Sequence, residues 1–301
     1  MDDRWPFFTV DLELTNVCYQ GCIFCPRERL TRPQGFMPRE LFAKIATQLA
    51  ENGSRVTFCG MGNPLLHPEL ETFGQLCMEL NLNFGLTIQA PALNQAGLEK
   101  IAALKPGFIE VSLPTISPGL YAELFPGQAL ETALNNLDNL VVQRGGTRGI
   151  TVNAVVTALE TENSEKMHEF WLNRGINFRL HACHSRGGNL VDNNLITASA
   201  REIKQCGLFA THSFITWNGQ LLACCHDLTG ETFIADLTRS TIREAAQAKL
   251  RFLEAPMPFK ICKSCDEPAA DRPIPLRPFP ESGKARSRYL KSLCQTKNTI
   301  K

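Results

Sequence analysis

Short β-rich runs alternate with amphipathic helical stretches from residue 8 to residue 181, and this alternation constrains the fold most. Neighbouring parallel strands need a crossover connection of this kind, which is usually a helix. The sequence therefore predicts an all-parallel sheet, although periodicity leaves open whether it is a barrel, a partial barrel or doubly wound. The expected strands are residues 8–14, 55–59, 83–88, 108–113, 150–156 and 177–181.

The expected helices follow from apolar stripes with helical spacing. Leu41, Ile45 and Leu49 recur at i, i+4 and i+8, and Gly53 stands where a C′ glycine ends a helix. A second stripe covers residues 70–80. Further helices are expected at residues 95–104, 129–142 and 165–173.

The pattern changes after residue 189. Asn218-Gly219 lies between β-rich runs at 213–216 and 220–224, which predicts a hairpin because both turn residues tolerate positive φ. A helix is expected at 240–249, and a proline-rich stretch follows it.

The two patterns predict two domains. We expect residues 1–190 to form the first domain and residues 191–301 a small appended domain with a hairpin and a helix. A domain with so little core often needs a staple such as a bound metal.

The charges exclude several classes of partner. Lys plus Arg number 31 and Asp plus Glu number 30, so a net charge of +1 gives no field that gathers nucleic acid or anionic lipid. The N-terminus opens with two acids instead of a basic signal, and no run approaches the ~18 apolar residues that span a bilayer. We therefore expect a cytoplasmic protein.

Twelve cysteines are an excess for a chain of this length. In a reducing compartment, clustered cysteines are metal ligands or catalytic thiols more often than disulfides. Cys18, Cys22 and Cys25 form C-x3-C-x2-C just after the first expected strand. Three such thiolates can ligate three irons of a [4Fe–4S] cluster and leave the fourth iron open. The alternatives are unrelated core cysteines or zinc, which usually takes four protein ligands in a closed site.

This spacing, with Phe24 before the last cysteine, resembles the radical S-adenosylmethionine (radical SAM) superfamily. Gly35-Phe36-Met37 opening the first helix and the Gly60-Met61-Gly62-Asn63-Pro64 loop after the second strand add to the resemblance. The resemblance implies an α/β fold, a partial (β/α)6 TIM-like barrel with its active site at the C-terminal ends of the strands. It also implies that S-adenosylmethionine binds the open iron and is cleaved reductively to a 5′-deoxyadenosyl radical.

The same resemblance implies several cofactor-binding residues, with one clear departure. Asn63 stands where relatives carry a carboxylate that holds the methionyl ammonium, so we expect a weaker contact there. Phe125 replaces an arginine that many relatives have. The alternative for these positions is ordinary hydrogen bonding at the ends of loops. The expected cofactor-binding residues are Phe24, Gly62, Asn63, Gln89 and Ser112.

A second cysteine set lies in the last third of the chain, spaced C-x17-C-x37-C-x2-C. It resembles the Twitch domain, the short relative of the SPASM domain, and this implies a second [4Fe–4S] cluster. A structural zinc is the alternative, and Cys225 or Cys294 could replace one of the expected ligands. These ligands are Cys206, Cys224, Cys262 and Cys265.

The reaction depends on residues beyond the clusters. Cys183 follows the last strand on the same face as His181, where its thiol could donate a hydrogen atom, although a small buried cysteine is the plainer interpretation. Resemblance implies oxidation or epimerisation of a polar small molecule of the sugar or aminocyclitol type, with flavodoxin or ferredoxin as one-electron donor. The early first strand favours a small molecule over a ribosomally made peptide. A non-catalytic metal-binding protein is the third hypothesis.

Overall fold

The computed structural model describes residues 6–160, 164–190, 193–198, 206–254 and 258–267. Its centre is a nine-stranded sheet in the order β6-β5-β4-β3-β2-β1-β7-β8-β9. Strands β1 to β7 are parallel neighbours, and β8 and β9 continue the sheet in antiparallel fashion. The strands are β1 Thr9–Leu12, β2 Arg55–Phe58, β3 Asn83–Gln89, β4 Phe108–Ser112, β5 Ile150–Val156, β6 Asn177–Ala182, β7 His212–Ile215, β8 Gln220–Leu222 and β9 Phe233–Asp236.

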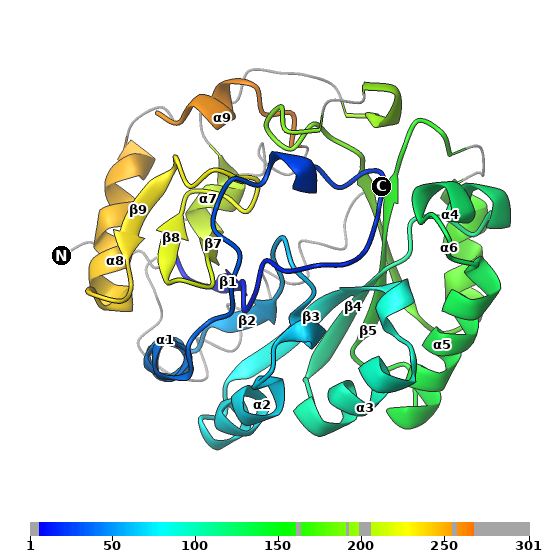
Figure 1. Ribbon diagram of the computed structural model, residues 1–301, viewed down its shortest axis with the longest axis horizontal. Coiled ribbons are helices and arrows are strands. Elements are labelled where there is room, and N and C mark those ends of the chain that lie inside the picture. Colours follow the sequence, from blue (N-terminus) through cyan, green and yellow to red (C-terminus); the bar gives the residue numbers. More distant parts are fainter. Residues whose placement is uncertain (1–5, 161–163, 191–192, 199–205, 255–257, 268–301) are drawn as a thin grey trace.

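Helices α1 to α6 cover the outer side of the first six strands, which curve into a partial barrel (Figure 1). The strand order is sequential, and helices lie on one face only, which excludes a doubly wound sheet. The expected partial (β/α)6 barrel is thereby confirmed. The helices are α1 Arg39–Glu51, α2 Leu70–Glu79, α3 Gln95–Leu104, α4 Pro118–Leu124, α5 Leu130–Gln143, α6 Ser164–Asn173, α7 Gly207–Thr211, α8 Ile242–Leu250 and α9 Lys260–Lys263.

Five short 3-10 helices complete the described elements: η1 Arg27–Arg29, η2 Pro64–Leu66, η3 Ala90–Ala92, η4 Asn193–Leu195 and η5 Arg251–Glu254. The ends of several elements differ by a few residues from the expected ranges. Helix α1 begins at Arg39, after the Gly35-Phe36-Met37 segment that was expected to open it. It ends as predicted, because Gly53 takes a φ of 66° just beyond its C-cap.

The predicted hairpin is present and extends the barrel sheet. Strands β7 and β8 pair on either side of Asn218-Gly219, and β7 also pairs in parallel with β1, with His212 beside Thr9. The hydrophobic core also includes residues beyond position 190, since Ile215 and Leu221 belong to the same buried cluster as the barrel strands. The division at residue 190 remains a prediction.

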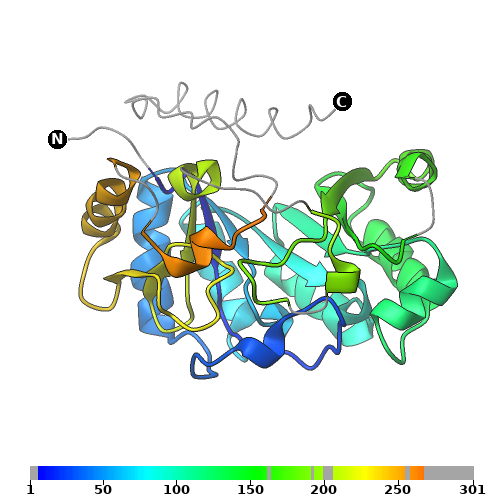
Figure 2. The same cartoon turned by 90° about the horizontal axis from the view of Figure 1, so that it is seen from above.

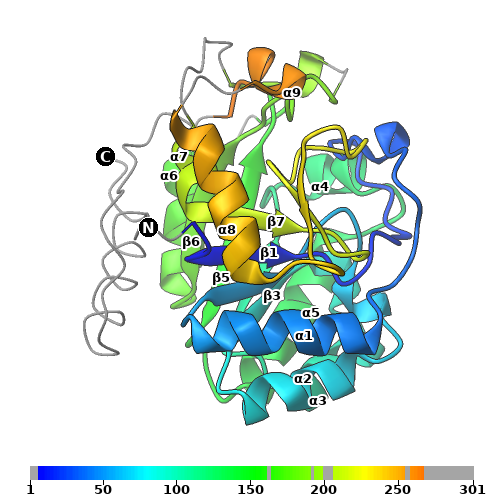
Figure 3. The ribbon, with the colours of Figure 1, turned by 90° about the vertical axis from the view of Figure 1, so that its left-hand side faces the viewer.

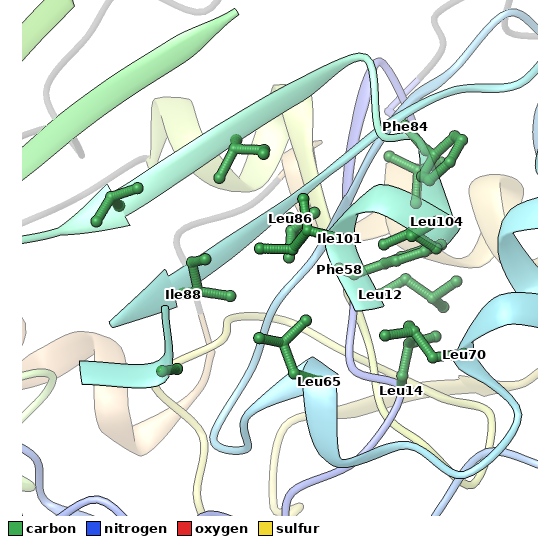
Figure 4. Close-up of a cluster of buried hydrophobic side chains, with 14 of the residues drawn as sticks. Leu12, Leu14, Phe58, Leu65, Leu70, Phe84, Leu86, Ile88, Ile101 and Leu104 are labelled. Atoms are coloured by element: carbon green, nitrogen blue, oxygen red, sulfur yellow. The ribbon is translucent and has the colours of Figure 1, made fainter. Parts of the chain in front are cut away.

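The main core lies between the outer face of the sheet and its helices. Figure 4 shows leucine and phenylalanine side chains of β1, β2 and β3 packed against α2, α3 and η2. Burial of this face leaves the alternate side chains of each strand on the inner, concave face. None of the described helices is long and apolar enough to cross a membrane.

Candidate active site

The concave face of the barrel is polar. Glu110 on β4 forms ion pairs with Arg55 on β2 at 3.7 Å and with Arg179 on β6 at 3.1 Å. These strands are not neighbours, so the three side chains meet across the concave face. Gly85 on β3 makes room for Phe108 on β4, because a Cβ there would lie 2.3 Å from the carbonyl oxygen and 2.4 Å from the ring of Phe108.

A second polar group lies around β1. His212 Nε2 is 2.6 Å from Asp11 Oδ2, and His212 Nδ1 is 2.8 Å from Thr9 Oγ1. The thiol of Cys59, just after β2, is hydrogen-bonded to Asp11. Burial and the charge of Asp11 raise the pKa of Cys59 well above its usual value, so this thiol stays protonated.

The loop between β1 and α1 carries the first three cysteines across the mouth of the barrel (Figure 1). Its Ile23 amide donates to the carbonyl oxygen of Leu124 in α4 at 3.2 Å, and its Thr31 amide donates to Leu228 beyond β8 at 3.2 Å. Figure 2 shows this loop, in blue, along one edge of the molecule. The loop therefore reaches both sides of the mouth at the C-terminal ends of the strands.

Cys18, Cys22 and Cys25 lie close enough to interact electrostatically, and each is half-buried. Burial, then the charges of Cys25 and Cys18, raise the pKa of Cys22 to about 12. Three thiolates in such a pocket require nearby positive charge, which an iron–sulfur cluster supplies. The donor set thus fits a cluster with three protein ligands.

The glycine-rich loop after β2 packs directly on the cysteine loop. A Cβ on Gly62 would lie 2.2 Å from the carbonyl oxygen of Thr15, and the Asn63 amide donates to the Val17 carbonyl at 2.9 Å. The Arg27 guanidinium donates to the carbonyl oxygens of both loops, at Asn16 and at Met61, at 2.7 Å each. Gly62 therefore serves to bring the two loops into contact.

A buried ion pair, which the sequence patterns did not predict, supports both loops. Arg32 donates to both carboxylate oxygens of Glu13, at 2.7 and 3.0 Å, and the Met61 amide donates to Glu13 Oε2 at 3.0 Å. Both side chains are almost fully buried. A charged residue at the end of an apolar strand was the available sequence signal.

The structure brings three polar side chains into one row across the middle strands β3, β4 and β5. Gln89 is the register partner of Ser112, and Ser112 is the partner of Asn153. Asn153 was missed, although it is an amide within an otherwise apolar run on β5. Its Nδ2 donates to Glu110 Oε2 at 3.2 Å, and its Oδ1 is buried and accepts no hydrogen bond within the described chain.

The other expected residues have clear local roles. Asn63 is buried, and its Oδ1 accepts a hydrogen bond from the Leu65 amide at 3.0 Å, so it caps η2. Phe24 packs edge-on against Phe125, with ring centroids 5.6 Å apart. Cys183 is only 2% exposed and packs in a small apolar cluster beside Phe24.

A model of the radical SAM superfamily matches residues 12–170, more than half of the 301 residues. The chain belongs to the radical SAM superfamily. S-adenosylmethionine and a [4Fe–4S] cluster are the cofactors expected of its members, and the cysteine loop fits that cluster. No curated protein matches this radical SAM chain in sequence.

Solved structures share the fold of this radical SAM protein. BtrN in complex with AdoMet and 2-DOIA aligns with a TM-score of 0.62 at 14% identity over 91% of this chain and 98% of its own. SuiB of Streptococcus suis bound to precursor peptide SuiA gives 0.65 at 16%, over 88% and 72%. AnSMEcpe with bound AdoMet gives 0.59 at 13%, over 97% and 100%. At these identities the likeness establishes the fold alone.

The second cysteine set of this radical SAM protein lies around the β7–β8 end of the sheet. Cys206 precedes α7, Cys224 follows β8, and Cys262 and Cys265 lie in and just after α9. Burial, then the charges of Cys206 and Cys265, raise the pKa of Cys262 to about 12. The charge of Cys206 is also among the causes that raise the pKa of Cys224. Cys206 therefore lies close enough to each of the other three expected ligands to interact with it electrostatically.

Further metal-binding side chains flank this set. Cys225 and His226 lie within 4.8 Å of Cys224, counted between ligand atoms. His184 Nε2 is 3.0 Å from Glu267 Oε2, and His226 joins this pair at 3.7 Å. Cys225 thus remains an alternative ligand, whereas Cys294 lies outside the described residues.

Proposed function

We propose that this radical SAM enzyme oxidises or epimerises a polar small molecule bound on the concave face of the barrel. The observation that carries the proposal is the charged layer of Glu110, Arg55 and Arg179 below the cysteine loop. Carboxylate and guanidinium groups bind hydroxyl, amine and anionic groups well, and a sugar or aminocyclitol presents such groups at high density. An apolar substrate would displace water from these charged groups and offer them no hydrogen bonds in return.

In this proposal Cys18, Cys22 and Cys25 hold a [4Fe–4S] cluster whose open iron binds S-adenosylmethionine. The bound pair supplies hydrogen abstraction from an unactivated carbon, and the protein supplies orientation and a water-poor site. Gln89 and Ser112 face the bound cofactor or substrate from the strand ends, and Asn153 holds Glu110 of the charged layer through its Nδ2. Phe24 and Gly62 shape the two loops. The Oδ1 of Asn63 accepts one hydrogen bond from the Leu65 amide and can accept a second from the cofactor.

We further propose that Cys206, Cys224, Cys262 and Cys265 hold an auxiliary [4Fe–4S] cluster in a Twitch-like arrangement. Their mutual proximity and burial support the proposal. A second cluster can accept the electron that remains on the substrate after hydrogen abstraction, which gives a net two-electron oxidation. Flavodoxin or ferredoxin is the class of donor that would reduce the first cluster.

A ribosomally made peptide is the second candidate substrate. The fold does not separate the two, because the BtrN structure holds 2-DOIA and the SuiB structure holds a precursor peptide. We favour a small molecule because the charged layer lies deep between β2, β4 and β6, where a compact polar ligand fits better than an extended chain.

Metal analysis and cofactor cleavage test the proposal together. Anaerobically reconstituted protein should bind about eight irons, at four per cluster, and should cleave S-adenosylmethionine once reduced. Replacing Cys18, Cys22 and Cys25 by Ala should leave about four irons and abolish cleavage. Stoichiometric zinc without iron would contradict the enzyme proposal and support a non-catalytic metal-binding protein.

Substrate panels then decide the class. Turnover of aminocyclitols or sugars, with no turnover of candidate peptides, supports the small-molecule proposal. Deuterium from heavy water in the product carbon indicates epimerisation, whereas its absence, with one S-adenosylmethionine consumed per turnover, indicates oxidation. A Glu110→Gln variant should bind such substrates more weakly while it still cleaves S-adenosylmethionine.

A further inference from the structure

Lys249 on α8 is a lysine with no exposed surface at all. Figure 3 shows α8 across the β7 end of the sheet, beside α1. The ammonium donates to the carbonyl oxygen of His212 at 2.5 Å and to Ser213 Oγ at 2.8 Å. It also lies 4.8 Å from the centre of the Phe209 ring. Its neighbours are therefore neutral, and no carboxylate of the described chain forms an ion pair with it.

A buried ammonium without a counter-charge is costly, and proteins normally pair or neutralise such groups. Desolvation lowers the pKa of Lys249 to about 7, and only the charges of Cys206 and Cys224 oppose this effect. Both cysteines belong to the proposed auxiliary site. These two thiols are therefore the groups that can supply negative charge to Lys249.

The packing around α7 agrees with this assignment. Phe209 on α7, whose ring lies against the ammonium, belongs to a small buried cluster with Leu250 of α8. Cys206 and Cys262 pack against the same cluster. Cys206 also caps α7, where its Sγ accepts a hydrogen bond from the Phe209 amide at 3.5 Å. Helices α7 and α8 therefore fix the lysine and the thiols within one structural unit.

We infer that Lys249 is the internal counter-charge of the auxiliary cluster and that it makes this cluster easier to reduce. The inference rests on the proposed function, since it requires a cluster on Cys206, Cys224, Cys262 and Cys265. A [4Fe–4S] core with four thiolate ligands is an anion, and one-electron reduction adds another negative charge. A fixed cation in a medium of low dielectric constant stabilises the reduced anion more than the oxidised one. The electron stays on the cluster, and no proton is transferred.

The test is a redox titration of the holoenzyme monitored by electron paramagnetic resonance. Lys249→Met should lower the midpoint potential of the auxiliary cluster by about 59 mV or more. This shift corresponds to a tenfold decrease in the equilibrium constant of the one-electron reduction. Lys249→Arg keeps the charge and should restore most of the potential. The first cluster, whose expected ligands lie in the loop between β1 and α1, should titrate as in the wild type.

Lys44→Met is the matched control. Lys44 on α1 also donates to backbone carbonyls, of Leu237 and Thr238, but it is not buried against the second cysteine set. Its removal should leave both potentials unchanged. If Lys249→Met folds poorly, Lys249→Gln removes the same charge with a polar side chain, and the same shift is expected.

The outcomes separate the inference from the proposed function. Wild-type protein with about eight irons, together with an unchanged auxiliary potential in both neutral variants, overturns the counter-charge role alone. Wild-type protein that binds about four irons and loses them all in the Cys18/Cys22/Cys25→Ala variant has no auxiliary cluster. That result overturns the auxiliary-site proposal and, with it, the inference.

Discussion

Arg32 and Glu13 form a two-pronged ion pair beneath the cysteine loop, with contacts of 2.7 and 3.0 Å. Glu13 directly follows β1 and also accepts a hydrogen bond from the Met61 amide, so the pair ties the cysteine loop to the glycine-rich loop. Both side chains are shielded from water. Removal of one partner would therefore leave the other charge buried and uncompensated.

Glu13→Gln should lower the free energy of unfolding by about 3–5 kcal/mol, the usual loss when one member of a buried pair is removed. Denaturant unfolding checks this value. The double variant Glu13→Gln/Arg32→Met should lose less, because neither charge is then left unpaired. Arg39→Gln breaks an exposed ion pair to Glu69 and serves as control, with an expected loss below about 1 kcal/mol. Equal losses in Glu13→Gln and Arg39→Gln would contradict the assignment.

Gly62→Ala should displace the cysteine loop. A Cβ at this position would lie 2.2 Å from the backbone oxygen of Thr15, and backbone cannot move aside as a flexible side chain can. We expect reduced iron at the first cluster and tenfold or greater loss of S-adenosylmethionine cleavage. Gly21→Ala is the control in the same loop, where an added Cβ would meet no atom within 4 Å, so this variant should behave as wild type. Normal iron content in Gly62→Ala would refute this account.

The regular elements follow from local sequence. Apolar periodicity predicts the six barrel strands, and Asn218-Gly219 predicts the hairpin because its turn needs positive φ at Gly219, which has a φ of 85°. Helix α4 was missed because its seven residues are too short for a clear stripe. Its proline in the first turn, after Ser117, was the available signal.

The long-range contacts could not be predicted in this way. The parallel pairing of β7 with β1 joins residues about 200 positions apart, as with Thr9 and His212, and no local pattern encodes such a partner. Lys249 lies on α8, whose sequence has the pattern of an ordinary amphipathic helix. The burial of Lys249 therefore depends on where α8 packs, which the local sequence does not encode. The cysteine spacing was informative because metal chemistry restricts it more tightly than packing restricts apolar residues.

Asp227 should stabilise the turn after Cys224 in a pH-dependent way. Burial opposes its ionisation, but hydrogen bonds from Thr232, Thr229 and Gly230 outweigh burial and hold its pKa below the usual value. A depressed carboxyl pKa stabilises the fold above the unfolded pKa of about 3.9 and loses this effect as the pH falls through the folded pKa. Asp227→Asn should therefore be less stable than wild type at pH 7 by about 1–3 kcal/mol. Denaturant unfolding from pH 7 to pH 3 should show the difference shrinking, and a constant difference would argue against the carboxylate.

Cys183 should act as the hydrogen donor if the reaction is an epimerisation. Its thiol packs beside Phe24 of the cysteine loop, and burial raises its pKa to about 11, so it carries a proton throughout the neutral range. In that role the S–H bond breaks, a C–H bond forms on the substrate radical, and a thiyl radical remains. Cys183→Ala and Cys183→Ser should still cleave S-adenosylmethionine but should not incorporate solvent deuterium into product.

Cys59→Ala provides the comparison for this experiment. Its thiol lies on the polar concave face, is hydrogen-bonded to Asp11 and has a raised pKa, so it is a second protonated thiol that could donate a hydrogen atom there. If Cys183 is the donor, deuterium incorporation should persist in Cys59→Ala and should not vary with pH between 7 and 9, well below the pKa of the Cys183 thiol. Loss of incorporation in Cys59→Ala, with normal incorporation in Cys183→Ala, would transfer the role to Cys59.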